Sequence, residues 1–461
     1  MDQPKKTDDT YESGNLKSML ALAIPISIQS LFQYSLSVID QVMVGQLGTN
    51  SVAAVGLGSN FPNVFIVTLA AIGTSASIMI AQFFGIKDKR SIRRAFFCNS
   101  LLALLVTLLF FIPSFALPKL IISLYTFDTN VIPLASNYLQ IIAPGYLFLL
   151  ITVMISALLR NTGKAKIPMM TGIISVALNT LLNYVLIFGR LGFPALGIIG
   201  TAVATTLTRF IESVLLILFL YFSRDKAHEG IEKVYVNIGK MMKQTIRIAA
   251  PVVLNEFLWG VGSTVYSIIY GRIGTEDMAA MTLTNPVQSL LIGLFSGFSA
   301  AAAILVGNCL GRNDFTSAYY TAIKILKFSI ICSAAAGGIL ILSSNIYVHL
   351  FHVEPDVQKN CIRILYVFAS LLCIKVGNMI VAGGILRCGG KTRYSLYLDL
   401  LGTWCIGIPL GLLAAVVFKL DIQWVYLAIS VEEVIRFILG IGILRSKRWM
   451  NSIAQPESAF G

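Results

Sequence analysis

Six acidic residues stand inside apolar stretches of this 461-residue chain, clear of the ends of those stretches: Asp40, Glu212, Glu256, Asp399, Glu432 and Glu433. An ionisable group at the centre of a bilayer costs about 2.5–3.5 kcal/mol on insertion scales, so each of these groups requires a partner or a task. A carboxylate in such a place can bind a proton, bind a cation or form an internal ion pair.

Asp40 has no basic neighbour in its stretch, where polar residues recur at three- to four-residue spacing: Pro25, Gln29, Ser30, Gln33, Ser37 and Asp40. This spacing puts the polar side chains on one helical face, which we expect to line a wet cavity. Asn179 and Asn183 stand four residues apart in a later stretch and also share a face. One interpretation is an oxygen-rich pocket in which Asp40, Asn179 and Asn183 bind a proton or a hard monovalent cation such as Na⁺. The alternative is interhelical hydrogen bonding that only joins the two stretches.

Glu256 follows Asn255 in a stretch with no Lys or Arg within helical reach. A carboxylate so placed attracts cationic ligands, and the alternative is an ion pair with Lys375. Asp399 could equally take Lys375.

Glu212 and Glu432 have candidate ion-pair partners nearby on their own helices. Glu212 lies three residues after Arg209, and Glu432 lies four before Arg436. Each pair shares a helical face, which predicts an internal ion pair. Glu433 has no obvious partner along its own helix and stays unassigned.

Prolines mark positions where a helix can bend. Pro25 and Pro251 fall near the starts of their stretches, where a missing N–H costs little, so helix-start residues are one interpretation. The apolar run continues well before Pro25, which favours a kink there. Pro286 lies well inside its stretch, and we expect a break in the helix at that point. All three prolines are candidates for positions that move.

Composition shows what kind of protein must position these residues. The chain is 56% hydrophobic and 12% charged, against roughly 25% charged in a typical soluble domain. A water-soluble fold of this size is therefore excluded. The 27 Phe and 17 Tyr exclude disorder as well. What remains is an all-α polytopic membrane protein.

A bilayer span needs about 20 mostly apolar residues, and charges, Gly and Pro divide the chain into twelve such stretches. We expect them at 17–41, 52–85, 95–125, 131–158, 167–189, 196–222, 243–271, 277–310, 318–351, 357–386, 393–418 and 422–445. The hydrophilic segment 223–242 separates them six and six. This predicts a tail at 1–16, an N-lobe at 17–222, an inter-lobe loop at 223–242, a C-lobe at 243–445 and a tail at 446–461.

The net charge of +13 is mostly a topology signal. Loops on the side of the N-terminus hold 24 Lys and Arg, and loops on the other side hold 5, namely Lys119, Arg190, Arg272, Lys359 and Lys419. This bias predicts a multi-pass protein of the cell membrane, plasma or inner, with both termini in the cytoplasm. Nucleic acid is unnecessary to explain the charge. We expect no cleaved signal, because the first span lacks a basic n-region followed by a short apolar core and a cleavage site.

Nothing predicts an enzyme, a metal centre or an organic cofactor. The seven cysteines include no C-x-x-C pair, and the three histidines form no cluster with them. Gly390-Lys391-Thr392 looks like the end of a nucleotide-binding loop, but Ile385 occupies the place of its first glycine.

The chain contains an internal repeat. At an offset of 226 residues, Pro25 meets Pro251, the turn Gly-Gln-Leu-Gly-Thr at 45–49 meets Gly-Arg-Ile-Gly-Thr at 271–275, and Gly85 meets Gly311. Because six spans are an even number, both halves enter the membrane from the same side. Parallel repeats of this kind, with the binding site between the halves, are typical of secondary transporters. We therefore expect two pseudo-symmetric six-helix lobes.

Together these features resemble the multidrug and toxic compound extrusion (MATE) transporters over nearly the whole chain. The resemblance rests on the two Gly-x-Leu/Ile-Gly-Thr turns, on SVIDQVMVG at 37–45, on LNTLLNYVLIFG at 178–189, and on Leu-Arg-x-x-Gly-Lys at 159–164 and 386–391. It implies a monomeric exporter in the lipid bilayer that expels organic cations and other amphipaths in exchange for inward Na⁺ or H⁺. The alternative is a flippase for lipid-linked oligosaccharides or other lipids from the same superfamily.

The resemblance also assigns residues. Asp40 matches the family's span-1 aspartate, and Pro25, Gln33 and Asn179 match its kink proline, span-1 glutamine and N-lobe asparagine. Asn183 departs from members that carry an aspartate there, which leaves Na⁺ and H⁺ both open. Thr201 and Thr205 are equal candidates for a threonine that joins this site in some members. Glu256, with Asn255, Gln33 and Asn378, is the candidate substrate site or second coupling site.

Overall fold

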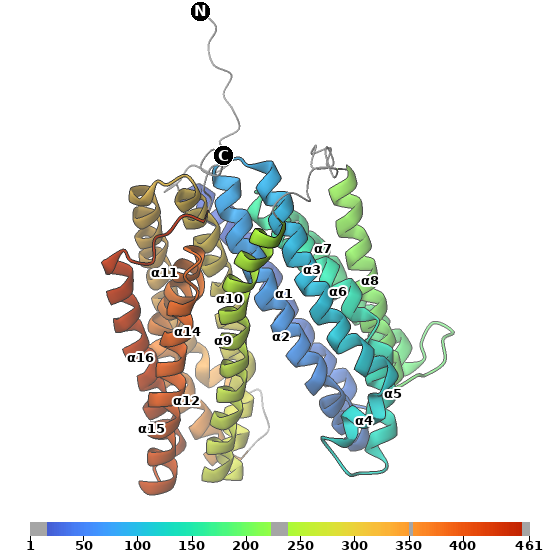
Figure 1. Cartoon of the computed structure of the whole chain (residues 1–461). Coiled ribbons are helices and arrows are strands. Elements are labelled where there is room, and N and C mark those ends of the chain that lie inside the picture. Colours follow the sequence, from blue (N-terminus) through green and yellow to red (C-terminus); the bar gives the residue numbers. More distant parts are fainter. Residues whose placement is uncertain (1–15, 223–237, 350–353, 454–461) are drawn as a thin grey trace, which may run out of the picture. The chain divides into compact units, whose positions relative to one another are not determined.

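The computed structural model describes residues 16–222, 238–349 and 354–453, apart from the side chains of residues 37, 38, 49, 50 and 275. The predicted inter-lobe loop and most of the two predicted tails lie outside these residues. The described residues up to 222 form eight helices: α1 (Leu16–Gly45), α2 (Thr49–Gly85), α3 (Lys89–Ala116), α4 (Pro118–Ser123), α5 (Val131–Ile142), α6 (Gly145–Asn161), α7 (Lys166–Phe188) and α8 (Ile198–Phe222) (Figure 1).

The second half is also helical, with three π-helical segments near its end. Its elements are α9 (Ile238–Ile273), α10 (Thr275–Gly311), α11 (Phe315–His349), α12 (Pro355–Asn378), η3 (Met379–Ile385), α13 (Leu386–Cys388), α14 (Arg393–Asp399), η4 (Leu400–Gly407), α15 (Ile408–Leu412), η5 (Leu413–Val417) and α16 (Ile422–Ser446). The structure assigns no strand to any residue that it describes.

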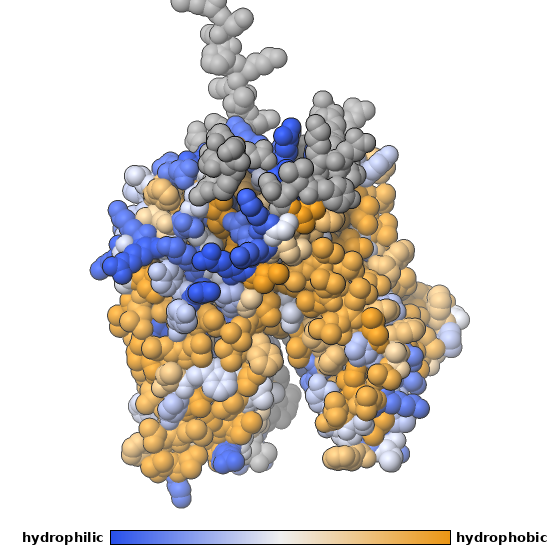
Figure 2. Space-filling model, in the orientation of Figure 1, coloured by the Kyte–Doolittle hydropathy of each residue, from blue (hydrophilic) through white to orange (hydrophobic). Residues whose placement is uncertain are grey.

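The helices confirm the predicted spans. Among the described residues, ten helices are long and apolar enough to cross a membrane, and α5 and α6, bent by 45° at their junction, make eleven when counted together as one span. The twelfth predicted stretch is α16, which is 25 residues long. Its charged residues Glu432, Glu433 and Arg436 make it less apolar than the other spans, so it is not among these helices. Hydrophobic side chains cover most of the visible helix flanks, and hydrophilic ones gather toward helix ends (Figure 2). The chain is thus a multi-pass, all-α membrane protein.

Contacts group the chain into two compact units that do not follow the midpoint of the sequence. The N-terminal unit comprises Ile28–Ile80 and Lys89–Phe257, and the C-terminal unit comprises Met1–Ser27, Ala81–Asp88 and Leu258–Gly461. The division therefore passes through α1, α2 and α9. Val253 of α9, for example, packs against the core of the N-terminal unit.

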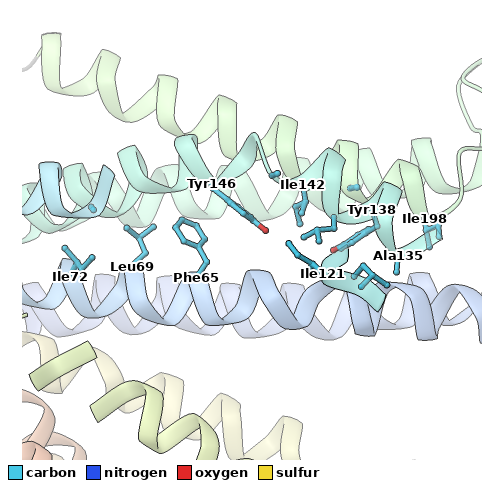
Figure 3. Close-up of a cluster of buried hydrophobic side chains, with 14 of the residues drawn as sticks. Phe65, Leu69, Ile72, Ile121, Ala135, Tyr138, Ile142, Tyr146 and Ile198 are labelled. Carbon is cyan, nitrogen blue, oxygen red and sulfur yellow. The ribbon is translucent and has the colours of Figure 1, made fainter. Parts of the chain in front are cut away.

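That core lies among α2, α3, α5, α6 and α8 (Figure 3). The rings of Phe65 and Tyr146 are 4.5 Å apart, and Leu69, Ile72 and Leu139 are almost fully buried beside them. Because lipid tails are as apolar as these side chains, close packing rather than exclusion of water must hold the helices together. Helix α8, which carries Thr201 and Arg209, belongs to this core through Ile198 and Ala202.

The predicted repeat is visible where α2 and α10 end, inside the C-terminal unit. A Cβ added at Gly85 would overlap the backbone of Asn308, and one added at Gly311 would overlap the backbone of Gln82. The two contacts are equivalent at the 226-residue offset. Only glycine permits backbones to approach this closely, so the crossing of α2 and α10 requires glycine at both positions.

Gln82 also fixes the segment that follows α16. Its amide nitrogen donates to the carbonyls of Cys388 at 2.7 Å and Asn451 at 3.2 Å, and its amide oxygen accepts from the Ile453 N–H at 2.6 Å. Trp449, fully buried, donates to the Leu444 carbonyl at 3.1 Å. The described end of the chain is therefore tied to α2 by one fully buried glutamine.

Candidate functional site

The structure brings Asp40 of α1 together with the two asparagines of α7. The Asn183 amide nitrogen donates to Asp40 Oδ1 at 2.7 Å and to Asn179 Oδ1 at 2.9 Å. Asn183 is fully buried and Asn179 is 3% exposed, whereas Asp40 is half-buried. The four-residue spacing on α7 therefore places both amides on the face that meets the carboxylate, as predicted.

Two buried oxygens near this group have no hydrogen-bond partner among the residues that the structure describes: Asn183 Oδ1 and Thr201 Oγ1. Thr201 follows Gly200, whose Cα lies against the backbone of Leu186, about one turn along α7 from Asn183. Thr201 is buried, whereas Thr205 is only half-buried. The two threonines, which were equal candidates from the sequence, therefore differ in burial.

A proton and Na⁺ place different demands on this group. A proton on Asp40 requires no rearrangement, because the Asn183 amide can stay where it is. Na⁺ requires several oxygens, and Asn183 turns its N–H group toward Asp40. Rotation of that amide would present the unpartnered Oδ1 instead. In the part of the chain that the structure describes, no group of three or more His, Cys, Asp or Glu side chains is placed to hold a metal ion.

A series of polar residues leads away from Asp40, and the sequence predicted only its Arg209–Glu212 pair. The Tyr138 hydroxyl of α5 lies in the electrostatic field of both Asp40 and Arg209 of α8. Arg209 in turn interacts with Glu212, and Glu212 with Arg160 at the end of α6. These residues lie within the N-terminal unit and lead from the carboxylate of α1 to Arg160, which contacts the same helix again at Gln29.

This series of polar residues ends at Gln29, and the prediction that Gln29 lines a wet cavity is wrong. Gln29 is 4% exposed and accepts a 2.7 Å hydrogen bond from Arg160, so it does not face a wet cavity. The polar stripe on α1 is therefore divided, with Gln29 buried and Gln33 exposed. Arg160 was counted as a loop cation because it stands in the last turn of its helix, next to the loop. Its contact with Gln29, 131 residues away, leaves no local sequence signal.

The predicted ion pairs of the C-terminal unit need three corrections. Lys375 pairs with Glu433 at 3.3 Å, so the alternative that it pairs with Glu256 is wrong, and so is its pairing with Asp399. Asp399 instead pairs directly with Arg436. Glu433, which had no predicted partner, is held by Lys375 and by Asn378. These pairs form because α12 packs against α16. Helical periodicity predicts which residues share a face of one helix, but it does not predict which helices are neighbours.

Arg436 lies 4.0 Å from both Glu432 and Glu433, beyond hydrogen-bond distance. The predicted Glu432–Arg436 pair is therefore at the largest separation at which two charged groups count as an ion pair. Asn378, a predicted substrate residue, donates to the Glu433 carbonyl and carboxylate at 2.7 Å each, so its amide is occupied within this network. Asn255 is 3% exposed and Glu256 is half-buried on α9.

The candidate prolines all lie inside helices. Pro25 is in α1 and Pro251 in α9, and both helices begin several residues earlier, so the helix-start interpretation is wrong. The boundary between the contact units falls just after each of them, at Ser27 and Phe257. α10 continues through Pro286, so the predicted break is wrong as well. The Tyr347 hydroxyl of α11 donates to the Leu283 carbonyl, three residues before Pro286, at 2.8 Å.

Two repeated helical halves with buried carboxylates in apolar helices define a secondary transporter. A family model for MatE matches the chain twice, over residues 25–185 and 251–413. The chain therefore belongs to the MatE family. The two matches begin 226 residues apart, which is the offset of the repeat.

Relatives match over most of their length. The chain is 25% identical over 454 residues to the uncharacterized transporter YisQ of Bacillus subtilis, covering 97% of this chain and 96% of that protein. It is 28% identical over 398 residues to the multidrug resistance protein NorM of Burkholderia vietnamiensis, covering 85% of each.

Solved structures share the fold. A MATE crystal structure in complex with MaL6 gives a TM-score of 0.86 at 20% identity, over 95% of this chain and 98% of that one. The outward-facing conformation of a multidrug resistance MATE family transporter of the MOP superfamily gives 0.85 at 20% identity, over 95% and 97%.

Proposed function

We propose that this protein is a secondary active multidrug exporter that expels organic cations and other amphipathic compounds in exchange for inward Na⁺ or H⁺. The observation that carries the proposal is the Asp40–Asn183–Asn179 group, a carboxylate inside a membrane helix whose partners are neutral amides. Membership of the MatE family and the multidrug resistance relatives support it.

Asp40 is the coupling residue in this mechanism. The ionised carboxylate accepts a charge-assisted hydrogen bond from Asn183, and these bonds are roughly twice as strong as neutral ones. A proton or Na⁺ on Asp40 removes that advantage and loosens α1 from α7. The change in charge also acts on the Tyr138 hydroxyl, which lies in the field of Asp40. Helix α1 then adopts a different position, and affinity for the drug falls.

Energy for export comes from the ion gradient. One charge moving inward supplies about 2.3 kcal/mol per 100 mV, but export of a monovalent cation costs the same electrical amount. A one-for-one exchange therefore runs on the concentration gradient of the ion alone. Because coupling is reciprocal, a bound drug lowers the affinity for the ion by the same factor.

Cationic substrates bind near Glu256 in this proposal, with Asn255 and Gln33 as polar contacts. All three belong to the N-terminal unit. Asn378 is no longer a substrate residue, since Glu433 holds its amide. Pro25 and Pro251 serve as hinges, because each lies inside a helix that runs from one contact unit into the other.

The protein works as a monomer in the cell membrane, plasma or inner, with both termini in the cytoplasm. The excess of Lys and Arg in loops on the side of the N-terminus supports this orientation. No nucleic acid, metal cofactor or chemical turnover enters the mechanism, and Na⁺ or H⁺ is the coupling ion.

Flipping of a lipid-linked oligosaccharide is less well supported. That task needs unpaired cations to hold phosphates, yet Lys375 is paired with Glu433 and Arg436 with Asp399. Arg209 lies in the field of Glu212.

Transport by purified protein in liposomes tests the proposal. A fluorescent organic cation should move against its gradient after a Na⁺ jump or after a pH jump, and the jump that works identifies the coupling ion. Absence of export under both jumps, with liposomes that remain tight to ions, would refute ion-driven export.

A further inference from the structure

Helices α12, α14 and α16 of the C-terminal unit bring five charged side chains together inside apolar helices. Lys375 comes from α12, Asp399 from α14, and Glu432, Glu433 and Arg436 from α16. The group therefore contains three carboxyls and two permanent cations. All five side chains are at most 17% exposed.

Each cation already has a direct partner. The Lys375 ammonium binds Glu433 at 3.3 Å, and Glu433 also accepts two hydrogen bonds from the Asn378 amide, one on its carbonyl and one on its carboxylate. The Arg436 guanidinium binds Asp399 directly. These two pairs leave Glu432 as the third carboxyl.

Glu432 is the most deeply buried of the three. It is 6% exposed, and its nearest cation atom is Arg436 Nη1 at 4.0 Å. Gly407 of η4 lies so close that an added Cβ would be 2.8 Å from Glu432 Oε2. The one hydrogen bond to its carboxyl group among the described residues is donated by the Tyr266 hydroxyl of α9, at 2.9 Å to Oε2.

In the part of the chain that the structure describes, the groups that interact with Glu432 from other helices are Tyr266 and Tyr270 of α9, both neutral, and Lys375 of α12. Asp399 of α14 is bound to Arg436. Segments η3, α15 and η5, which also pack against α16, contain no charged residue. Segment η4 has the sequence LLGTWCIG and contains no charged residue. With all three carboxyls ionised, the group would carry one uncompensated negative charge in a medium of low dielectric, which is strongly unfavourable.

Tyr266 is suited to both states of Glu432. A hydroxyl is donor and acceptor at once, so the 2.9 Å contact can serve an ionised carboxylate or receive the proton of a neutral carboxyl group. Tyr266 also shares a hydrogen bond with Thr403, 3% exposed in η4. Thr403 gives the Tyr266 proton an alternative acceptor when Glu432 is neutral.

We infer that Glu432 is a proton-binding site of the C-terminal unit, separate from Asp40, and that its carboxyl group holds one exchangeable proton in this conformation. The neighbouring ion pairs Lys375–Glu433 and Arg436–Asp399 stay charged. The inference does not rest on transport, so it stands or falls independently of the role proposed for Asp40.

Infrared difference spectroscopy on purified protein in lipid tests this directly, because a protonated carboxylic acid has a carbonyl stretch that a carboxylate lacks. At neutral pH the wild type should show this band, and it should shift in D₂O. Glu432→Gln should remove the intensity of one carboxyl group, and Asp40→Asn should leave that component unchanged. Full intensity in Glu432→Gln would overturn the inference.

Tyr266→Phe provides a second readout if Glu432→Gln does not fold. It removes the hydrogen bond to the carboxyl group, so the band of Glu432 should move in frequency while keeping its intensity. A band that does not move in Tyr266→Phe belongs to another carboxyl group and contradicts the assignment.

Thermal stability separates the neutral from the charged state. Glutamine mimics a protonated glutamate, so Glu432→Gln should melt close to the wild type, whereas Glu433→Gln should melt well below it because Lys375 loses its counter-ion. Equal losses in the two variants would mean that Glu432 is ionised, and would overturn the inference.

Discussion

The Lys375–Glu433 pair offers a quantitative test of how buried charge is balanced in the C-terminal unit. At 3.3 Å and an effective dielectric constant of about 20, the attraction is about 5 kcal/mol. Most of it offsets the cost of removing the two charges from water. Lys375→Met deletes the attraction and leaves the Glu433 carboxyl group, 16% exposed, without its counter-ion. Breaking a buried pair in this way costs about 3–5 kcal/mol.

The assay is thermal unfolding of purified protein in detergent. A loss of about 3 kcal/mol corresponds to a fall in Tm of about 6–12 °C for a unit of roughly 200 residues. The double variant Lys375→Met/Glu433→Gln removes both charges and should recover much of this loss. Calorimetry of the four proteins of the cycle yields the coupling energy.

The same helix provides a matched control. Lys359 and Asp356 of α12 are 3.2 Å apart, but their side chains are 66% and 74% exposed. Exposed pairs contribute about 0–1 kcal/mol, so Lys359→Met should change the Tm by little. The reasoning is refuted if Lys375→Met melts as Lys359→Met does, or if the double variant melts below Lys375→Met.

Three further predictions concern the C-terminal unit. Gly311→Ala should lower expression and Tm, because its methyl group would overlap the backbone of Gln82; an unchanged Tm would contradict the close approach. Gln82→Leu should leave the chain folded but make the segment near Asn451 more sensitive to protease. Equal cleavage rates in the variant and the wild type would contradict the view that Gln82 fixes this segment. The Ser317 N–H donates to Asp314 at 3.0 Å and lowers the pKa of that carboxyl, so its stabilising effect is present above the ordinary value of 3.8 and is lost as pH falls below it. Asp314→Ala should therefore melt lower than the wild type at neutral pH and equal to it in strong acid, and a difference that persists in acid would contradict this.

Periodicity and composition were sufficient to predict the helices. Hydrophobic stretches of the right length located all twelve segments, and the 226-residue repeat predicted the equivalence of Gly85 and Gly311 that the structure shows at the crossing of α2 and α10. The π-helical segments, which lie in the tenth and eleventh predicted stretches, were not predicted, because apolar composition does not reveal an inserted residue.

The candidate site was predictable where the signal was local. Asn179 and Asn183 share a face of one helix, and an isolated Asp40 in hydrocarbon demands polar neighbours, so their meeting could be expected. Contacts between distant helices could not. Lys375 meets Glu433 across 58 residues, and Arg160 meets Gln29 across 131. Each choice depends on which helices pack together, and one sequence does not state this.

The central claim is that Asp40 couples an ion to export. Its most direct test is uphill export of a fluorescent organic cation by liposomes that contain Asp40→Asn, with Asp128→Asn, an exposed loop carboxylate, as the matched control. The account predicts that Asp40→Asn abolishes uphill export under both Na⁺ and pH jumps, while Asp128→Asn exports at the wild-type rate. Uphill export at the wild-type rate by Asp40→Asn would contradict it.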